Sequence, residues 1–112
     1  MKHINSTSLP EPIAQYLDSA NRFDAAGATG NFTSDAVVSD EQKEYVGHAA
    51  IERWIIQTSE AYQPHVTVTS ILALGANVKM AGSIAGNFPG SPLKLEYEFA
   101  LRDGKIARLS IR

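Results

Sequence analysis

The 112-residue chain contains no cysteine. A protein without cysteine forms no disulfide, offers no thiolate to a metal ion and has no cysteine nucleophile. The absence also removes the usual sequence evidence for an oxidising or a reducing compartment. Any catalytic group must therefore be sought among the oxygen and nitrogen side chains.

Long apolar runs and runs of like charge are missing as well. No stretch approaches the roughly 20 apolar residues that cross a bilayer, and the opening MKHINSTSLPEP lacks the apolar segment of a signal peptide. The formal net charge is only -2, whereas a surface that binds nucleic acid needs clustered Lys and Arg. We therefore expect a cytoplasmic protein that binds neither a membrane nor nucleic acid.

Common catalytic motifs are absent too. The chain has no G-x-S-x-G, no Walker loop and no G-x-G-x-x-G. His3 lies near the start of the chain, while His48 and His65 are expected to open a helix and a strand as surface residues. No two of these histidines have metal-ligand spacing with a carboxylate. The sequence predicts no metal site and requires no organic cofactor.

The length allows a single domain, residues 1–112, and its first half is predicted to be helical. A first helix is expected from Leu9 to about Gly27, because apolar residues recur there at helical spacing. Ser8 and Glu11 have the spacing of a capping box. A second, short helix is expected after Asp24, which can cap it.

A third helix is predicted from Gly47 or His48 to about Tyr62, because Pro64 marks its end. One face of this helix carries Ile51, Trp54, Ile55, Thr58 and Tyr62. Trp54 is the only tryptophan of the chain, and its position on this face predicts that it is buried.

The second half of the chain changes to the period-two alternation of strands. A brief strand, Ala36–Ser39, precedes the third helix, and a polar loop joins the two. Four further strands are expected in VTVTSILAL, NVKMAGSIAG, LKLEYEFAL and IARLSIR. We interpret the last turn as a three-residue loop, Arg102–Gly104. This loop would place Phe99 opposite Ala107 and Tyr97 opposite Leu109.

Helices followed by a meander of antiparallel strands predict an α+β fold, with the helices on one face of the sheet. The alternation then assigns a set of strand residues to the inward face: Val78, Met80, Ile84, Leu95, Tyr97, Phe99, Leu101, Leu109 and Ile111. Apolar residues at regular spacing are usually core.

Asp40 is the main candidate for chemistry, because it ends the first strand beside the expected hydrophobic wall. It can be a general base at the mouth of a pocket, but an Asp after a strand also commonly caps a turn. The neighbouring Glu41 is expected to face solvent.

Two tyrosines on inward faces, Tyr16 and Tyr97, are the second candidates, because a buried phenol needs a partner for its hydroxyl. An apolar pocket beside them is expected to be lined by large side chains. The residues assigned to this ligand-binding wall are Phe32, Trp54, Tyr62, Met80, Phe88 and Phe99.

Three segments of the chain resemble the SnoaL-like branch of the nuclear-transport-factor-2-like superfamily: YLDSANRFDAAGATGNFTSDAVVSDE, YVGHAAIERW and YEFALRDGKIARLSI. The resemblance covers nearly the whole chain. It implies a cone-shaped, cystatin-like α+β barrel in which three N-terminal helices pack on a curved antiparallel sheet and enclose an apolar pocket.

Ketosteroid isomerase, a member of this superfamily, implies roles for three residues. Its oxyanion-hole tyrosine lies on the first helix at the place of Tyr16, and its catalytic base lies at the place of Asp40. Its second oxyanion donor, a protonated Asp, falls on Tyr97 when one residue is dropped from the final turn. A tyrosine hydroxyl can also donate a hydrogen bond.

The resemblance leaves three hypotheses for the function. In the first, the chain carries out cofactor-independent proton transfer, of isomerase or cyclase type, on a small apolar or cyclic ketone. In the second, it is a non-catalytic binding module for a small apolar molecule. In the third, it is a hydrolase or dehydratase, which needs further polar groups in the pocket. The sequence does not place Arg22, Arg53 or His65 there.

Many members of the superfamily pair as homodimers through the outer face of the sheet, so the resemblance implies a homodimer here. The outer face predicted for this chain is small and mixed, and consists of Thr67, Thr69, Ile71, Ala81, Ser83, Ala85, Glu96, Glu98 and Arg108.

Overall fold

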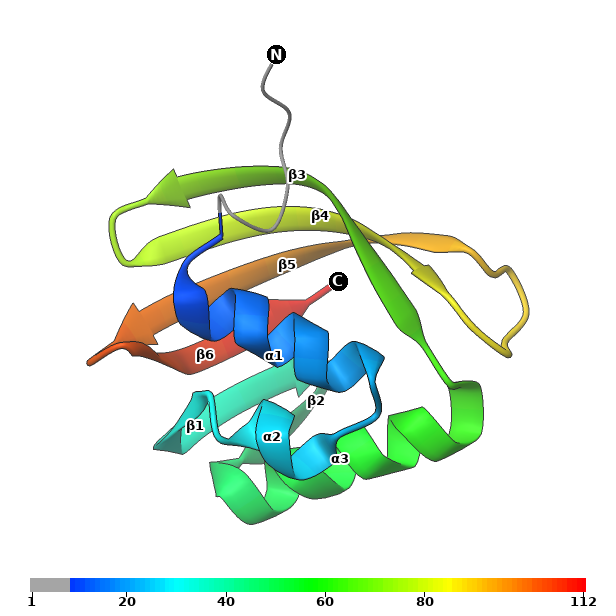
Figure 1. The fold of residues 1–112 in the computed structure, drawn as a ribbon, viewed down its shortest axis with the longest axis horizontal. Helices are drawn as coiled ribbons and strands as arrows, with labels where there is room; N and C mark the ends of the chain where they lie inside the picture. The colour runs from blue at the N-terminus through cyan, green and yellow to red at the C-terminus, as the bar shows by residue number, and fades with distance from the viewer. Residues whose placement is uncertain (1–8) are drawn as a thin grey trace.

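A computed structural model describes residues 9–112 of the chain (Figure 1). The elements of this part are, in order, α1 (Glu11–Asn21), α2 (Ala25–Thr29), β1 (Phe32–Asp40), β2 (Lys43–Val46), α3 (Gly47–Tyr62), β3 (His65–Leu74), β4 (Asn77–Ala85), β5 (Leu93–Arg102) and β6 (Lys105–Ile111). None of the helices among these residues is both long and apolar enough to span a membrane.

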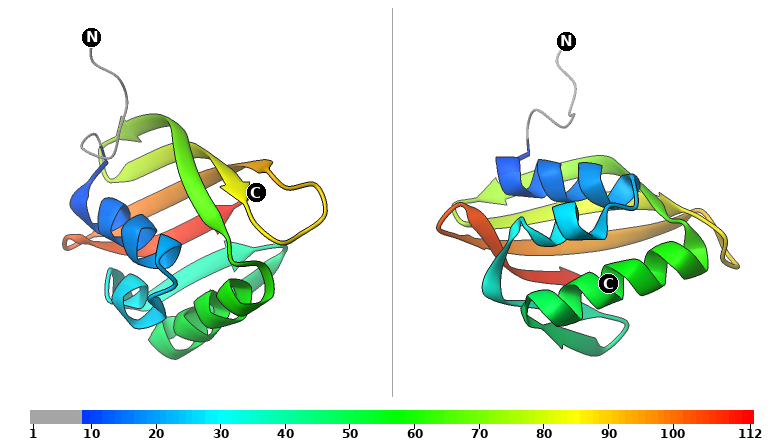
Figure 2. Two further views of the ribbon diagram at one scale, coloured as in Figure 1. Left: turned by 45° about the vertical axis from the view of Figure 1, so that its right-hand side comes forward. Right: turned by 60° about the horizontal axis from the view of Figure 1, so that its bottom comes forward.

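Six strands form one curved sheet, in the order β2-β1-β6-β5-β4-β3. The helices cover one face of this sheet (Figures 1 and 2), so the α+β prediction is confirmed. The prediction of a purely antiparallel sheet is wrong in one place, because β1 and β6 pair in parallel. Two parallel strands must be joined by a long crossover connection. The chain between β1 and β6 is long enough for this, because it includes α3 and β3–β5.

The core lies between the helices and the sheet. It contains Ile13 and Leu17 from α1, and Ile51 and Ile55 from α3. The strand residues predicted to face inward are buried or packed against this core, as expected. Trp54 is only 7% exposed, which confirms its predicted burial. The prediction for the third helix is confirmed from Gly47 to Tyr62.

The start of α1 agrees with the two prolines. Pro10 takes the N-cap position and Pro12 falls in the first turn, where a missing N–H removes no helical bond. Pro10 has no side-chain oxygen to cap the helix. Ser8, the predicted cap, and His3 lie outside the described residues.

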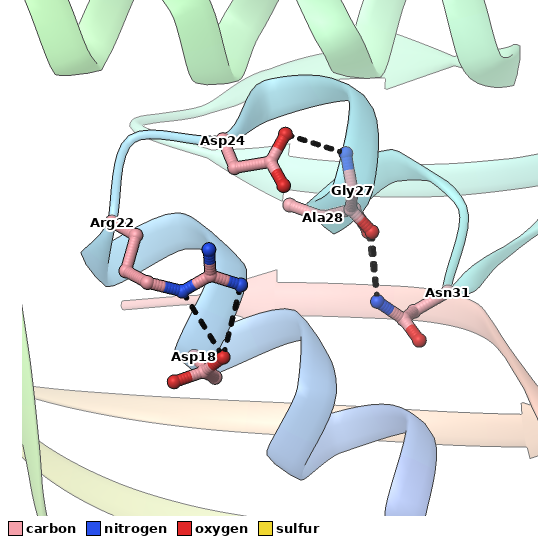
Figure 3. Close-up of polar contacts among 6 residues, drawn as sticks. All are labelled: Asp18, Arg22, Asp24, Gly27, Ala28 and Asn31. Atoms are coloured by element: carbon pink, nitrogen blue, oxygen red, sulfur yellow. Dashed lines mark hydrogen bonds and ion pairs between the residues drawn. The ribbon is translucent and has the colours of Figure 1, made fainter.

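The first helix is shorter than predicted, since α1 ends at Asn21 and not near Gly27. The chain leaves the helical conformation at Phe23, whose φ is 60°. The Asp24 carboxylate then accepts a hydrogen bond from the Gly27 N–H at 3.0 Å (Figure 3). This cap satisfies a first-turn donor of a new helix, and α2 is therefore a separate element.

The first strand is longer than the predicted Ala36–Ser39, and the predicted polar loop after it contains β2. Asp40 pairs with Lys43, so Glu41 and Gln42 alone form the turn of a hairpin. Their φ angles are 53° and 66°. Two-residue turns of this kind usually carry Asn-Gly or Asp-Gly, and the sequence therefore gave no hairpin signal here.

The predicted three-residue loop before the last strand is wrong. Arg102 pairs with Lys105, which leaves a two-residue turn of Asp103 and Gly104. Both turn residues have positive φ, 55° and 74°, the conformation that Asp-Gly readily takes.

A bulge at Ala107 restores the inward faces of β5 and β6. This residue has no partner on β5, and beyond it Phe99 pairs with Leu109 and Tyr97 with Ile111. The register differs by two residues from the predicted one. Because side chains alternate with period two, a shift of two leaves Tyr97, Phe99, Leu109 and Ile111 on their predicted inward face. Before the bulge the faces differ from the prediction, since Ile106 and not Ala107 is buried.

A second bulge, in β3, shows that the predicted position of Ile71 on the outer face is wrong. The register of β3 against β4 changes between Val68 and Ser70, so Thr69 is the extra residue. Ile71 then pairs with the buried Met80 and packs against the core. It does not belong to the outer face, because one extra residue inverts the faces of the rest of a strand.

The bulge at Ala107 can be tested by comparing two neighbouring substitutions. Ile106 is fully buried, so Ile106→Ala should lower the free energy of unfolding by about 2–5 kcal/mol. Ala107→Ser should change it by less than about 1 kcal/mol. Urea unfolding of both variants measures the difference. In the three-residue-loop register Ala107 would be the inward residue, and the larger loss would then come from its substitution.

Candidate functional site

A cavity of about 380 Å³ lies between α1, α3 and the helix-covered face of the sheet. Its wall contains two acidic residues, Asp40 and Glu41, and is otherwise mainly apolar. Five aromatic side chains line it: Tyr16, Trp54, Tyr62, Phe88 and Tyr97. Concave, mostly apolar cavities with a few polar groups are the usual form of small-molecule sites.

Asp40 reaches the cavity from the end of β1, and α3 holds it there. The Trp54 indole N–H donates a hydrogen bond of 3.1 Å to the Asp40 Oδ2. Tyr45 of β2 stacks on the indole, with ring centroids 5.9 Å apart. The carboxylate is therefore fixed by a side chain that is itself held on one side by α3 and on the other by an aromatic ring.

The turn-cap interpretation of Asp40 is not what the contacts show. A capping Asp accepts hydrogen bonds from backbone N–H groups of its own turn. Among residues 9–112, the hydrogen bond that lowers the pKa of this carboxyl comes from the Trp54 side chain, and no backbone N–H contributes.

The environment makes Asp40 a stronger base than an ordinary aspartate. Burial raises the pKa of its carboxyl, the Trp54 hydrogen bond acts in the opposite direction, and the charge of Glu41 adds to the rise. A higher pKa increases the driving force for taking a proton, provided that the group is still ionised at the working pH.

Tyr16 and Tyr97 lie on α1 and β5 and are 5% and 2% exposed. Phe32 packs edge-on against Tyr16, with ring centroids 5.3 Å apart, and Phe99 stacks on Tyr97 at 6.1 Å. Burial is the main cause that raises the pKa of both phenols, and the charge of Asp40 raises each further. Both hydroxyls therefore stay protonated and can donate hydrogen bonds at neutral pH.

The two hydroxyls are available to a ligand. Neither Tyr16 nor Tyr97 has a side-chain hydrogen-bond partner within residues 9–112. In the same part of the chain no enclosed side-chain polar atom lacks a partner, and both tyrosines line the cavity. A carbonyl oxygen of a ligand in the cavity could therefore accept a hydrogen bond from each hydroxyl.

The predicted ligand-binding wall divides into two groups. Trp54, Tyr62 and Phe88 line the cavity, and the last two meet edge to face at 5.8 Å. The other three predicted residues, Phe32, Met80 and Phe99, are buried outside the lining. They support Tyr16 and Tyr97 from behind and do not face the cavity.

Two features of the site were missed by the sequence analysis. Glu41, predicted to face solvent, is exposed but also lines the cavity, because the β1–β2 turn that contains it follows directly on Asp40. Tyr45 was not recognised because β2 itself was not. Alternation of Tyr45 with charged neighbours in KEYV was the available signal.

Positive charge is absent from the cavity wall. Arg22, Arg53 and His65, which the sequence could not place, do not line the cavity, and the described lining contains no Lys, Arg or His. The His48 Nε2–H donates a hydrogen bond of 2.8 Å to the Phe32 carbonyl, and His48, like His65, is exposed. The polar chemistry of this site therefore rests on carboxylates and hydroxyls.

Solved structures match the chain over nearly its whole length. A "putative polyketide cyclase" from Sinorhizobium meliloti is 33% identical, with a TM-score of 0.94, over 97% of this chain and 100% of that one. A hypothetical protein with a ketosteroid isomerase-like fold from Catenulispora acidiphila, in complex with trimethylamine, is 18% identical, with a TM-score of 0.83, over 94% and 86%.

A third match, an uncharacterized cystatin-fold protein from Novosphingobium aromaticivorans, is 14% identical, with a TM-score of 0.78, over 98% of this chain and 99% of that one. The two matches below 25% identity show the fold alone. No protein-family model and no curated protein matches the chain.

The raised pKa of Asp40 predicts an unusual effect on stability. A group whose pKa is higher in the folded state contributes stability below its unfolded pKa and loses it as the pH rises through the folded value. Asp40→Asn should therefore raise the free energy of unfolding at about pH 7 and make no difference near pH 3. The amide oxygen can still accept the Trp54 hydrogen bond.

Asp35 provides a control, because its replacement by Asn should change the stability in the opposite direction. Hydrogen bonds from Thr33 and Arg102 lower the pKa of its carboxyl, so Asp35→Asn should destabilise the protein at neutral pH and do so less in acid. Denaturant unfolding of both variants at the two pH values measures these effects. A loss of stability in Asp40→Asn at neutral pH would contradict the account of its environment.

Proposed function

Because the chain belongs to the SnoaL-like branch of the nuclear-transport-factor-2-like superfamily, we propose that it binds a small, cyclic, ketone-type compound in the cavity and moves a proton on it. The observation that carries this proposal is the meeting of Asp40, Tyr16 and Tyr97 at one apolar cavity. A base and two neutral donors are the minimal set for forming and stabilising an enolate.

The reaction would proceed in two steps. Asp40 removes a proton from the carbon next to the carbonyl, and the electron pair of that C–H bond moves onto the carbonyl oxygen. Tyr16 and Tyr97 donate hydrogen bonds to the resulting enolate oxygen. In an isomerase, whose ketone carries a neighbouring C=C bond, Asp40 then returns the proton to the far carbon of the dienolate. In a cyclase, the enolate carbon attacks a second carbonyl of the same molecule, and Asp40 gives its proton to the alkoxide that forms there.

The environment of each group supports its role. Burial raises the pKa of Asp40 towards that of a stronger base, and it keeps the two phenols protonated. Donors held in a site of low polarity stabilise developing charge more than they would in water, because they need little reorganisation. The similarity to a protein described as a polyketide cyclase agrees with this class of chemistry.

A non-catalytic binding module remains the alternative, since the same apolar wall could hold a ligand without reaction. The two possibilities differ in what Asp40 contributes. A binding module needs the shape of the side chain, whereas an enzyme also needs its charge and basicity.

Exchange of carbon-bound hydrogen separates the two functions. Cyclic ketones are incubated with the protein in deuterated water, and label at the α-carbon is followed by mass spectrometry or NMR. Asp40→Asn should reduce enzyme-dependent exchange by roughly 10²–10⁴-fold, with little change in ligand affinity. Tyr16→Phe and Tyr97→Phe should each reduce it separately, since each removes one donor.

Asp103→Asn is the matched control, because this exposed aspartate lies in the β5–β6 turn away from the cavity, and it should leave the rate unchanged. Equal exchange in wild type and Asp40→Asn would show that Asp40 is not the base. Binding of ketones with no exchange in any variant would favour the binding module.

We also propose that a second copy of the chain packs on the outer face of the sheet. This face has a groove that contains Leu72 and Ala81 together with charges of both signs. Glu98 lies 3.9 Å from Lys79 and 3.5 Å from Arg112 in ion pairs that are exposed in the monomer. An isologous interface can pair such acidic and basic groups across a two-fold axis and cover Leu72.

The dimer proposal is tested by placing a charge in this groove. Ala81→Glu adds a third acidic residue beside Glu96 and Glu98, so it should shift the protein towards the monomer in light scattering. Ala26→Glu makes the same change on an exposed position of α2 and should have no effect. A wild-type protein that stays monomeric at high concentration would contradict the proposal.

A further inference from the structure

Among the described residues, the charged side chains of the cavity wall are all acidic. Asp40 and Glu41 are the ionisable acids of the lining, and within the described residues no cationic side chain lines the cavity to balance them. The remaining polar groups of the wall are neutral, such as the hydroxyls of Ser59 and Tyr62 and the amide of Asn21. The Asn21 amide is occupied by the backbone of Val66, with bonds of 2.9 and 3.0 Å.

Glu41 holds an unusual position for a turn residue. Its backbone has a φ of 53°, and that of Gln42 has 66°, in the left-handed region that glycine and asparagine occupy at least cost. Neither residue type is favoured for such a turn. The conformation keeps the Glu41 side chain exposed and at the same time on the cavity wall, so it stands at the opening.

The two acids are electrostatically linked. The two residues are neighbours in the chain and both line the cavity, and the charge of Glu41 is one of the causes that raise the pKa of Asp40, after burial. An anion entering the cavity would meet both charges, and its own desolvation would add to the repulsion.

We propose that Glu41 is a specificity-determining residue that, together with Asp40, excludes anionic ligands from the cavity. The ligand is then a compound of one or two rings that carries a carbonyl or hydroxyl group and no negative charge, and free carboxylic acids and phosphate esters are rejected. The cavity volume of about 380 Å³ lies at the small end of the ~300–1,000 Å³ range of ligand sites. This inference takes the location of the ligand from the proposed function but does not require turnover.

The exposure of Glu41 determines how strongly its charge should weaken the binding of an anion. Two unit charges about 4 Å apart interact by about 1 kcal/mol in bulk water and by several times as much near a protein surface. An interaction of about 1 kcal/mol corresponds to roughly a 5-fold change in affinity. Salt screens exposed charges, so the contribution of Glu41 should shrink at high ionic strength, which a purely steric role would not do.

Three naphthalene derivatives of similar shape provide the test: 2-(hydroxymethyl)naphthalene, 2-naphthoate and 2-(aminomethyl)naphthalene, which are neutral, anionic and cationic at about pH 8. Isothermal titration calorimetry gives their affinities. Wild type should bind the neutral compound at least about 10-fold more tightly than the anion. The cation should bind no more weakly than the neutral compound.

Glu41→Gln should reduce the preference for neutral over anion by roughly 5-fold. About 0.5 M sodium chloride should remove most of this difference between variant and wild type. Glu44→Gln is the control, because Glu44 is an exposed carboxylate of the same hairpin, on β2, that does not line the cavity. Its affinities should equal those of wild type.

Each other result overturns the inference. Binding of the anion as tightly as the neutral compound, an unchanged preference in Glu41→Gln, an equal change in Glu44→Gln, or no binding of any probe would contradict it. Failure of the proposed function is seen separately. If the preference depends on Glu41 but ketones exchange no hydrogen, charge selection stands and proton transfer is wrong.

Discussion

The hydrogen bond from the Trp54 indole N–H to the Asp40 carboxylate joins α3 to the end of β1, and the site depends on it. It fixes the direction of Asp40, which within residues 9–112 is the one partly buried carboxylate of the cavity wall. The indole is held in place by α3, which carries Trp54, and by the ring of Tyr45 stacked on it. The short β1–β2 hairpin is therefore part of the site, since it supplies both Asp40 and Tyr45.

A single physical cause, removal of water, adjusts all three polar groups of the candidate site. Burial favours the neutral form of any acid, so it makes Asp40 a stronger base and keeps Tyr16 and Tyr97 as hydrogen-bond donors. The Phe32 and Phe99 rings behind the tyrosines contribute to this burial without touching the cavity. Core packing and the chemistry of the site are thus linked through the same side chains.

The sequence alone predicted an element correctly where the regular spacing of apolar residues extended over a long segment and the ends of that segment were marked. Gly47 and Pro64 delimit α3, and the alternation of β5 placed Tyr97 and Phe99 inward correctly although the predicted turn was wrong. The reason is that the two-residue turn and the bulge at Ala107 each shift the register by one residue, so together they differ from the predicted register by an even number. The extra residue at Thr69 inverts the faces instead, and the prediction for Ile71 failed.

Contacts between distant elements were beyond the reach of pattern analysis. The burial of Trp54 followed from its helical face, but its hydrogen bond to Asp40 depends on how α3 lies against β1, which no local spacing encodes. The position of Glu41 depends on a hairpin whose turn has neither Asn nor Gly. The resemblance to a family supplied Asp40, Tyr16 and Tyr97 as a set, and the cavity they share supplied the physical reason to consider them together.

The most direct test of this account is an NMR titration of the Trp54 indole N–H, which gives a single resonance because the chain has one tryptophan. Its chemical shift should follow the ionisation of Asp40, with a midpoint above the ordinary pKa of an aspartate, and the transition should vanish in Asp40→Asn. A resonance that does not titrate with Asp40, or a midpoint at or below the ordinary value, would contradict the claim that a buried, tryptophan-bound carboxylate is the base of this site.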